Sequence, residues 1–237
     1  MGFHDDHGRF YRRWLQEHRR HLRRLLTAPR EPTHHQTLQP LVDAVVAHYA
    51  AYFVSKSRYA KRDVLAIFDA TWSTTLERGL QWIAGWRPAV AFHLFYSESS
   101  LRLETQLTEI LHGRGSGDLG DLHPTQLTRI GDLHLETVRE EKRITARMAD
   151  WQEDRVVAHS LDDSDLNMEE ELRTILEEAD QLRLGTIRRV VESLNPLQAV
   201  DFLTAAAELQ IGIREWGEER DGTRGPPDDD DDKSSTD

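Results

Sequence analysis

The sequence predicts an all-α protein: a single bundle of about seven or eight helices with a disordered acidic C-terminal tail. Two observations carry this prediction. Alternating runs of β-branched residues are scarce along the 237 residues, and residues that start helices recur. Pro88, Pro124 and Pro196 occupy first-turn positions, and Asn195 precedes the last of them as an N-cap. A hydrophobic content of 38% is sufficient to form a buried core.

The first helix is expected over residues 6–27, with its apolar residues on one face. That face holds Phe10, Tyr11, Trp14, Leu15, Leu22, Leu25 and Leu26. His7, His18 and His21 fall on the same face. Residues 7 and 18 are about 16 Å apart on a helix, too far for one metal ion, so we expect buried, hydrogen-bonded histidines and no metal site. Haem held by histidines of two helices remains an alternative, although no spacing selects which pair of histidines would bind it.

The opposite face of the same helix carries seven arginines and no apolar residue. We call this set the arginine face; it consists of Arg9, Arg12, Arg13, Arg19, Arg20, Arg23 and Arg24. A basic amphipathic helix is typical of a partner-binding helix or of a helix on an anionic membrane. The alternative is a helix that packs on its own domain and leaves its arginines in water.

Seven further helices complete the predicted bundle. They are expected over residues 36–56, 61–84, 88–97, 100–112, 124–159, 168–193 and 196–217. Thr74 with Glu77 and Asn167 with Glu170 have the spacing of capping boxes. The aromatic residues of the second and third helices are interpreted as core, with a pocket for an apolar ligand as the alternative.

The domain organisation predicted from composition is a flexible N-terminus over residues 1–7, one helical domain over residues 8–217 and a disordered tail over residues 218–237. Five adjacent aspartates, Asp228–Asp232, follow two prolines in that tail and repel one another. The net charge of −12 is unevenly distributed, because residues 1–30 carry eight arginines against three acids. We therefore expect the basic front to attract the acidic back, within one molecule or between molecules.

Signs of catalysis or cofactor binding are missing from the sequence. The absence of cysteine excludes disulfides, thiolate metal sites and cysteine nucleophiles. There is no glycine-rich phosphate loop after a strand, no nucleophile elbow and no zinc-protease motif. We expect no enzyme activity, no cofactor and no metal. No signal peptide or membrane-spanning run is present, so a cytoplasmic protein is expected, with the periphery of the plasma membrane and the nucleus as alternatives.

A series of short motifs lies between residues 8 and 217. The motif residues singled out are Trp14, Tyr49, Asp63, Trp72, Glu77, Trp82, Gly85, Arg87, Asp180 and Arg183. In its order and spacing this series resembles the plant delay-of-germination domain, which also forms the C-terminal half of TGA-type bZIP transcription factors. The resemblance implies an all-α, non-catalytic plant regulatory domain in which these residues are structural. The bZIP members carry a basic region and a zipper ahead of this domain. Only seven residues precede it here, so direct sequence-specific DNA binding is not expected.

The resemblance thus indicates a stand-alone member of the family. Our first interpretation is a pollen-aperture factor of the INAPERTURATE POLLEN type that acts through protein or membrane-surface contacts. The alternatives are a seed-dormancy or transcription-linked regulator bound to a phosphatase, calmodulin or a transcription complex, and a haem or small-ligand sensor. The expected associations are an acidic protein partner, peripheral membrane contact and a homodimer.

Overall fold

The computed structural model describes residues 3–30, 35–111, 117–158 and 165–222. Within these ranges the chain forms eight helices and no strand, so the predicted all-α fold is confirmed. The helices are α1 (Phe3–Leu26), α2 (His35–Ala60), α3 (Val64–Asp69), α4 (Thr75–Gly79), α5 (Ala89–Leu111), α6 (Pro124–Ala158), α7 (Asp165–Glu192) and α8 (Pro196–Asp221).

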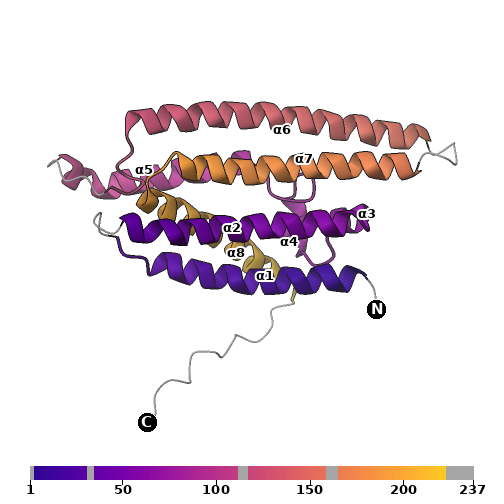
Figure 1. The fold of residues 1–237 in the computed structure, drawn as a ribbon, viewed down its shortest axis with the longest axis horizontal. Coiled ribbons are helices and arrows are strands. Elements are labelled where there is room, and N and C mark those ends of the chain that lie inside the picture. The colour runs from indigo at the N-terminus through magenta and orange to yellow at the C-terminus, as the bar shows by residue number, and fades with distance from the viewer. Residues whose placement is uncertain (1–2, 31–34, 112–116, 159–164, 223–237) are drawn as a thin grey trace, which may run out of the picture.

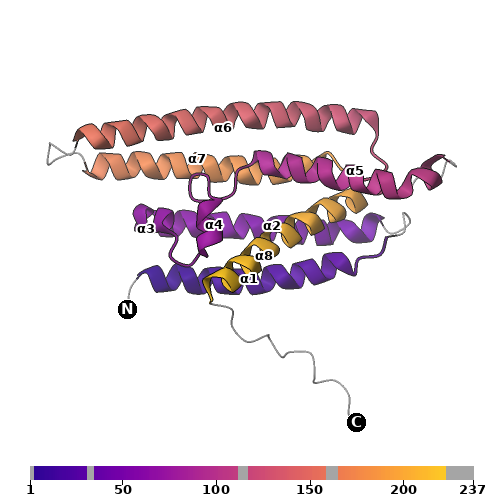
Figure 2. The same cartoon turned by 180° about the vertical axis from the view of Figure 1, so that it is seen from behind.

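Four long helices lie in a row in the order α6, α7, α2, α1 (Figure 1). Seen from behind, α5 and α8 cover one side of this row, and α8 crosses both α2 and α1 (Figure 2). The short helices α3 and α4 lie at one end, where α3 contacts α2 and α7 and α4 contacts α8. The connection between α2 and α5, which contains α3 and α4, thus contacts both the row and α8.

Two apolar clusters stabilise this arrangement. The larger joins α1, α2, α5 and α8 and buries Trp14, Phe92, Phe95 and Phe202. The smaller joins the end of α2 with α3, α6 and α7, around residues such as Ile144. Because removing apolar area from water is the main favourable contribution to folding, these clusters hold the row and its cover together.

Helix α1 forms as its amphipathic pattern predicts, with Tyr11, Trp14 and Leu15 buried against α2 and α8. Leu26 is an exception, since it is half-exposed at the end of the helix. The helix begins at Phe3, inside the segment that the sequence assigns to a flexible N-terminus. At the other end α8 continues to Asp221, and the rest of the predicted acidic tail lies outside the described residues.

The prediction of one helix over residues 61–84 is wrong, because local caps divide this segment. The Asp63 carboxylate accepts a hydrogen bond from Ala66 N at 2.8 Å and starts α3, and Ala70 ends it in the left-handed conformation at φ 46°. Thr74 starts α4 with the predicted capping box. Beyond α4 the backbone turns, and Trp82 N donates to Gly85 O at 2.7 Å.

The predicted break between residues 97 and 100 is also wrong, since α5 is continuous from Ala89 to Leu111. In the structure the Ser99 hydroxyl donates to Tyr96 O at 3.1 Å, a bond within its own helical turn. A serine that bonds back to the preceding turn is compatible with a continuous helix.

Candidate functional site

The arginine face of α1 points away from the bundle. Six of its seven arginines are exposed, and Arg19 is half-buried beside α8, where it faces Glu215 at 3.4 Å. Arg9 pairs with Asp6, and Arg20 pairs with Glu17 at 2.8 Å. The other four arginines, Arg12, Arg13, Arg23 and Arg24, form no ion pair with any described residue. Their charge is therefore available to another molecule.

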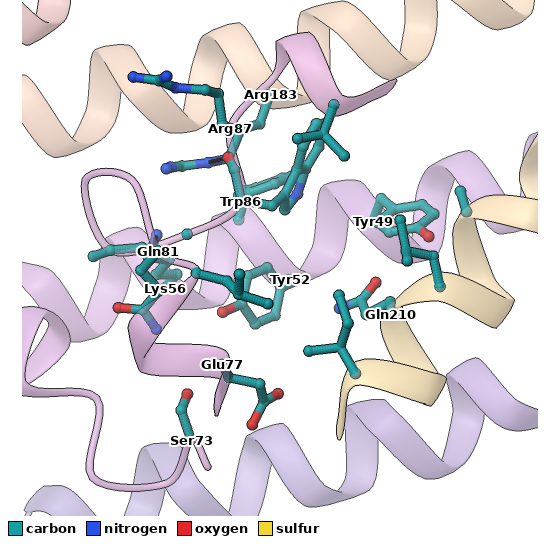
Figure 3. A pocket seen from close by; sticks show the side chains of 18 of the residues that line it. Tyr49, Tyr52, Lys56, Ser73, Glu77, Gln81, Trp86, Arg87, Arg183 and Gln210 are labelled. Atoms are coloured by element: carbon teal, nitrogen blue, oxygen red, sulfur yellow. Dashed lines mark hydrogen bonds between the residues drawn. The ribbon is translucent and has the colours of Figure 1, made fainter. Parts of the chain in front are cut away.

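The opposite side of α1 borders a pocket of about 380 Å³, which we call the aromatic pocket (Figure 3). It lies between α1, α2, α8 and the segment that connects α4 to α5. Aromatic rings supply much of its wall, among them Tyr11, Tyr49, Tyr52, Phe53, Trp72 and Trp86. The aromatic residues that the sequence assigned to the core are thus in part the lining of a cavity.

A buried cluster of charged side chains lies at the edge of the aromatic pocket. Lys56 Nζ donates to Asp180 Oδ1 at 2.9 Å and to Ala84 O at 2.7 Å, and Arg183 Nη1 donates to the same carboxylate oxygen at 2.5 Å. Burial lowers the pKa of Lys56 to about 8, although the carboxylate of Asp180 acts in the opposite direction. Two cations share one carboxylate here, so carbonyl oxygens must supply their remaining hydrogen bonds.

For Arg183 these carbonyl oxygens belong to the turn over residues 82–86, which the guanidinium holds in place. Its Nε donates to Trp86 O at 2.7 Å, and its Nη2 donates to Ile83 O at 2.9 Å and to Trp82 O. Ile83 and the residue after it adopt left-handed backbone conformations, with φ of 46° and 52°. A Cβ atom on Gly85 would lie only 2.7 Å from Arg183 Cζ, so the guanidinium requires glycine there.

A second cluster forms around Glu77 at the α4 side of the pocket. The Tyr11 hydroxyl donates to Glu77 Oε1 at 2.8 Å, while Arg214 Nη1 and Thr74 N donate to Oε2 at 2.9 Å and 2.7 Å. Arg214 Nη1 also donates to Trp72 O at 2.8 Å. Glu77 thus joins α4 to both α1 and α8.

His7, His18 and His21 are buried, as predicted, and rings of α1 form a stack with α2. The Trp14 ring lies parallel to His18 and to His48, with centroid distances of 4.8 and 4.7 Å. Burial lowers the pKa of His18 to about 3 and that of His48 to about 4. The predicted hydrogen bond exists for His18, whose Nε2 lies 3.4 Å from the Tyr49 hydroxyl, but His7 has no hydrogen-bond partner among the described residues.

The structure brings most of the motif residues together. Those that line the aromatic pocket are Trp14, Tyr49, Trp72, Glu77, Gly85, Arg87 and Arg183. Trp82 and Asp180 stand next to it through their contacts with Arg183. Asp63 is separate, because it caps α3. Arg87 lies 6.0 Å from the Trp82 ring and 3.7 Å from Glu141.

Sequence reasoning did not place Lys56, Glu141 and Arg214 among the site residues. The resemblance to the delay-of-germination domain also covers Lys56, which is not among the motif residues singled out above. Glu141 accepts a hydrogen bond from Ala89 N at 2.5 Å, a contact across 52 residues that no local pattern reveals. Within the described ranges no group of three or more His, Asp or Glu residues is placed to hold a metal ion. No described helix is long and apolar enough to cross a bilayer.

Comparison with known proteins gives consistent similarities. The DOG1 family model, described as seed dormancy control, matches residues 20–97. The chain is 32% identical to Protein DOG1-like 2 of Arabidopsis thaliana, over 90% of this chain and 90% of that protein. It is 31% identical to Protein DOG1-like 3 of the same plant, over 90% and 84%. The TGACG-sequence-specific DNA-binding protein TGA-2.1 of Nicotiana tabacum is 35% identical over 42% of this chain and 22% of its own length.

Proposed function

The chain belongs to the DOG1-like family of plant regulatory proteins, and on that premise we propose that it is a non-catalytic regulator of the seed-dormancy type. In this proposal it binds an acidic protein partner on the arginine face of α1. The family model's description supports the dormancy assignment. Similarity to TGA factors supports a role in protein assemblies. The pollen-aperture interpretation stays a prediction that a comparison of expression in seeds and anthers will test.

One observation carries the proposal: four guanidinium groups on one helix face have no carboxylate partner among the described residues. Like charges on neighbouring turns repel each other, so these arginines do not stabilise α1 on their own. The chain has an excess of acids, with a net charge of −12, and yet none of the acids in the described ranges pairs with these four arginines. Arginine binds carboxylates in a bidentate manner, and such pairs direct the association of proteins.

The state of the apolar face favours a protein partner over a membrane. A helix that lies on a bilayer inserts its apolar face into the lipid. In α1 that face is already buried in the bundle, where Trp14 and Leu15 are about 5% exposed or less. An acidic protein surface needs only the guanidinium groups, which are exposed.

The test measures the binding of a labelled twelve-residue oligo-glutamate peptide by fluorescence anisotropy, using the full chain. The double variant Arg12→Glu with Arg23→Glu reverses two charges on the arginine face. Its matched control, Arg129→Glu with Arg139→Glu, makes the same change on the exposed face of α6. We expect the first variant to bind the peptide at least about tenfold more weakly, and the control to bind like the original protein.

Binding to lipid vesicles, measured with the same variants, distinguishes an acidic protein partner from an anionic membrane. Equal peptide binding by the two variants would refute the role of the arginine face. If vesicles of phosphatidylserine are bound in an Arg12- and Arg23-dependent manner while the peptide is not, the partner is a membrane and our choice of an acidic protein is wrong.

A further inference from the structure

We propose that the aromatic pocket binds an uncharged, largely apolar small molecule that carries a hydroxyl, carbonyl or amine group. This site is distinct from the arginine face, because the two lie on opposite sides of α1. The proposal rests on the size of the pocket, on the pairing of its charges and on the neutral polar groups that line it (Figure 3).

The volume of about 380 Å³ is that of a ligand site and not of a packing defect. Small-molecule pockets occupy roughly 300–1,000 Å³, whereas an engineered apolar cavity of about 150 Å³ already binds benzene. Protein interiors are otherwise close-packed, with few voids larger than a water molecule. A largely apolar hollow of this size gives a small organic ligand a place that excludes water.

The charged groups at the pocket are already paired with each other, and this selects against a charged ligand. Lys56 and Arg183 share the carboxylate of Asp180, and Glu77 accepts bonds from Tyr11 and Arg214. Each of these side chains already has an oppositely charged partner, so an ionised ligand would have to compete with one of these pairs. Burying an unpaired charge is far more costly than burying a neutral group.

Neutral hydrogen-bonding groups at the pocket remain without a partner. The hydroxyl of Tyr52 and the side-chain amides of Gln81 and Gln210 form no hydrogen bond with any described residue, and all three line the pocket (Figure 3). Burial raises the pKa of Tyr52, so its hydroxyl stays protonated and can donate. Hydroxyl and amide groups among aromatic walls favour a ligand with one polar end, since a few polar groups orient the ligand in such sites.

Two fluorescent probes with the same ring system test the class of ligand. N-phenyl-1-naphthylamine is neutral, and 1-anilinonaphthalene-8-sulfonate is the same molecule with an added sulfonate. We titrate the full chain with each probe and follow the emission. The expected result is saturable binding of one equivalent of the neutral probe, at least about tenfold tighter than binding of the sulfonate.

Variants on α8 then place the bound probe. Ala206 lines the pocket, so Ala206→Trp fills it and should abolish binding, while Ala206→Leu fills it in part and should weaken binding. The control is Glu208→Trp, which adds the same side chain at an exposed position of α8. Tyr52→Phe removes only the hydroxyl and should weaken binding by about three- to tenfold. Melting curves of each variant show which proteins remain folded.

Three results would overturn the proposal. Binding of the sulfonate as tightly as the neutral probe would show that the site accepts anions. Binding that is unchanged in both folded Ala206 variants would place the probe elsewhere. The lack of saturable binding of the neutral probe by the original protein would show that the hollow takes no such ligand. Each result leaves the arginine face proposal unaffected, since that is tested with a peptide on the other side of α1.

Discussion

His18 is the residue whose environment is least compatible with a charge. It is completely buried, it stacks on Trp14, and its Nδ1 has no hydrogen-bond partner among the described residues. A neutral imidazole behaves there as an aromatic packing group. Among the described residues an imidazolium would have no carboxylate to pair with, and it would lie beside a second histidine, His48, at a ring distance of 5.4 Å. Docking of α1 on α2 therefore depends on neutral histidines.

This environment predicts a loss of stability in mild acid. The pKa of His18 is lowered from 6.5 to about 3, and those of His7 and His48 to about 4. Because the unfolded chain takes up protons first, stability is full above pH 6.5 and decreases as the pH falls towards 4. At pH 5 His18 alone accounts for roughly 2 kcal/mol. Urea unfolding at pH 7.5 and pH 5 measures the difference.

The variant His48→Gln tests whether the stacked histidines cause this loss of stability. It removes one of the stacked imidazoles and should reduce the pH dependence of the unfolding free energy. The exposed His123→Gln should leave the pH dependence as it is. A protein whose unfolding free energy is equal at the two pH values would contradict the prediction.

Gly85 provides a second prediction for a single residue. In Gly85→Ala the new Cβ would displace the Arg183 guanidinium from the carbonyl groups that it binds, and we expect a loss of about 2–4 kcal/mol in unfolding free energy. Gly131→Ala is the matched control, because nothing lies within 4 Å of a Cβ at that helical position. The control should gain up to about 1 kcal/mol from helix propensity. Equal effects of the two substitutions would exclude the contact as the cause.

Among single residues, the direction of the arginines and the burial of three histidines of α1 could be predicted from helical periodicity alone. The partners of these residues could not. His48 joins the stack from α2, and Arg214 reaches Glu77 across 137 residues. Such pairs depend on how helices meet, which a local pattern does not contain.

At the level of whole elements, the long helices follow from the sequence and the connections do not. The Asn195 cap and the Thr74 capping box are confirmed, because both side chains accept from the backbone of the next turn. The capping box predicted at Asn167 is wrong, since α7 already begins at Asp165. The prediction of one continuous helix over residues 61–84 was wrong because two N-caps and a left-handed residue interrupt a segment whose apolar residues have helical spacing.

The N-terminus of α8 carries the prediction that belongs to this level. Asn195 Oδ1 accepts from Leu197 N and Gln198 N at 2.9 Å, while its Nδ2 donates to Gly117 O at 2.8 Å. Asn195→Ala removes the cap and the link, and should cost about 1–2 kcal/mol of unfolding free energy. Asn195→Ser keeps an N-cap and should cost less, so thermal melts of the two variants separate the cap from the link. An Ala variant as stable as the original would contradict this account.

Over the whole molecule, the path of α8 brings the acidic end of the chain to its basic beginning. The C-terminal half of α8 packs on α1, where Glu215 faces Arg19 (Figure 2). Fifteen residues follow Gly222, including five adjacent aspartates. At about 3.3 Å per residue they can span roughly 50 Å, more than the length of α1. We therefore predict that this acidic segment competes with an acidic partner for the arginine face.

Deletion of residues 223–237 should therefore tighten binding of the oligo-glutamate peptide. The gain should be largest at low salt, because screening over about 10 Å at 0.1 M weakens the competition. Replacement of Asp228–Asp232 by asparagines keeps the length of the chain and should act like the deletion. Equal peptide affinity in all three proteins, measured at 50 and 300 mM salt, would show that the acidic segment does not compete.

The fold class and the family could be predicted for the molecule as a whole, because several motifs in series and helix-starting residues are properties of the sequence itself. The sequence predicted the aromatic residues to be packed in the core, and a pocket for an apolar ligand was only the alternative. Its volume results from where α8 crosses the row of helices, and that crossing depends on contacts between residues far apart in the chain.

The turn over residues 82–86 has a consequence for the order of folding. Its carbonyl groups bind to Arg183, about 100 positions further along the chain, and to Lys56 on α2. The left-handed residues of this turn gain their compensating bonds only after α2 and α7 have met. Contacts of such long sequence separation form late, since the entropy of closing the intervening loop must be overcome first. The turn therefore cannot acquire these bonds before α2 and α7 have met.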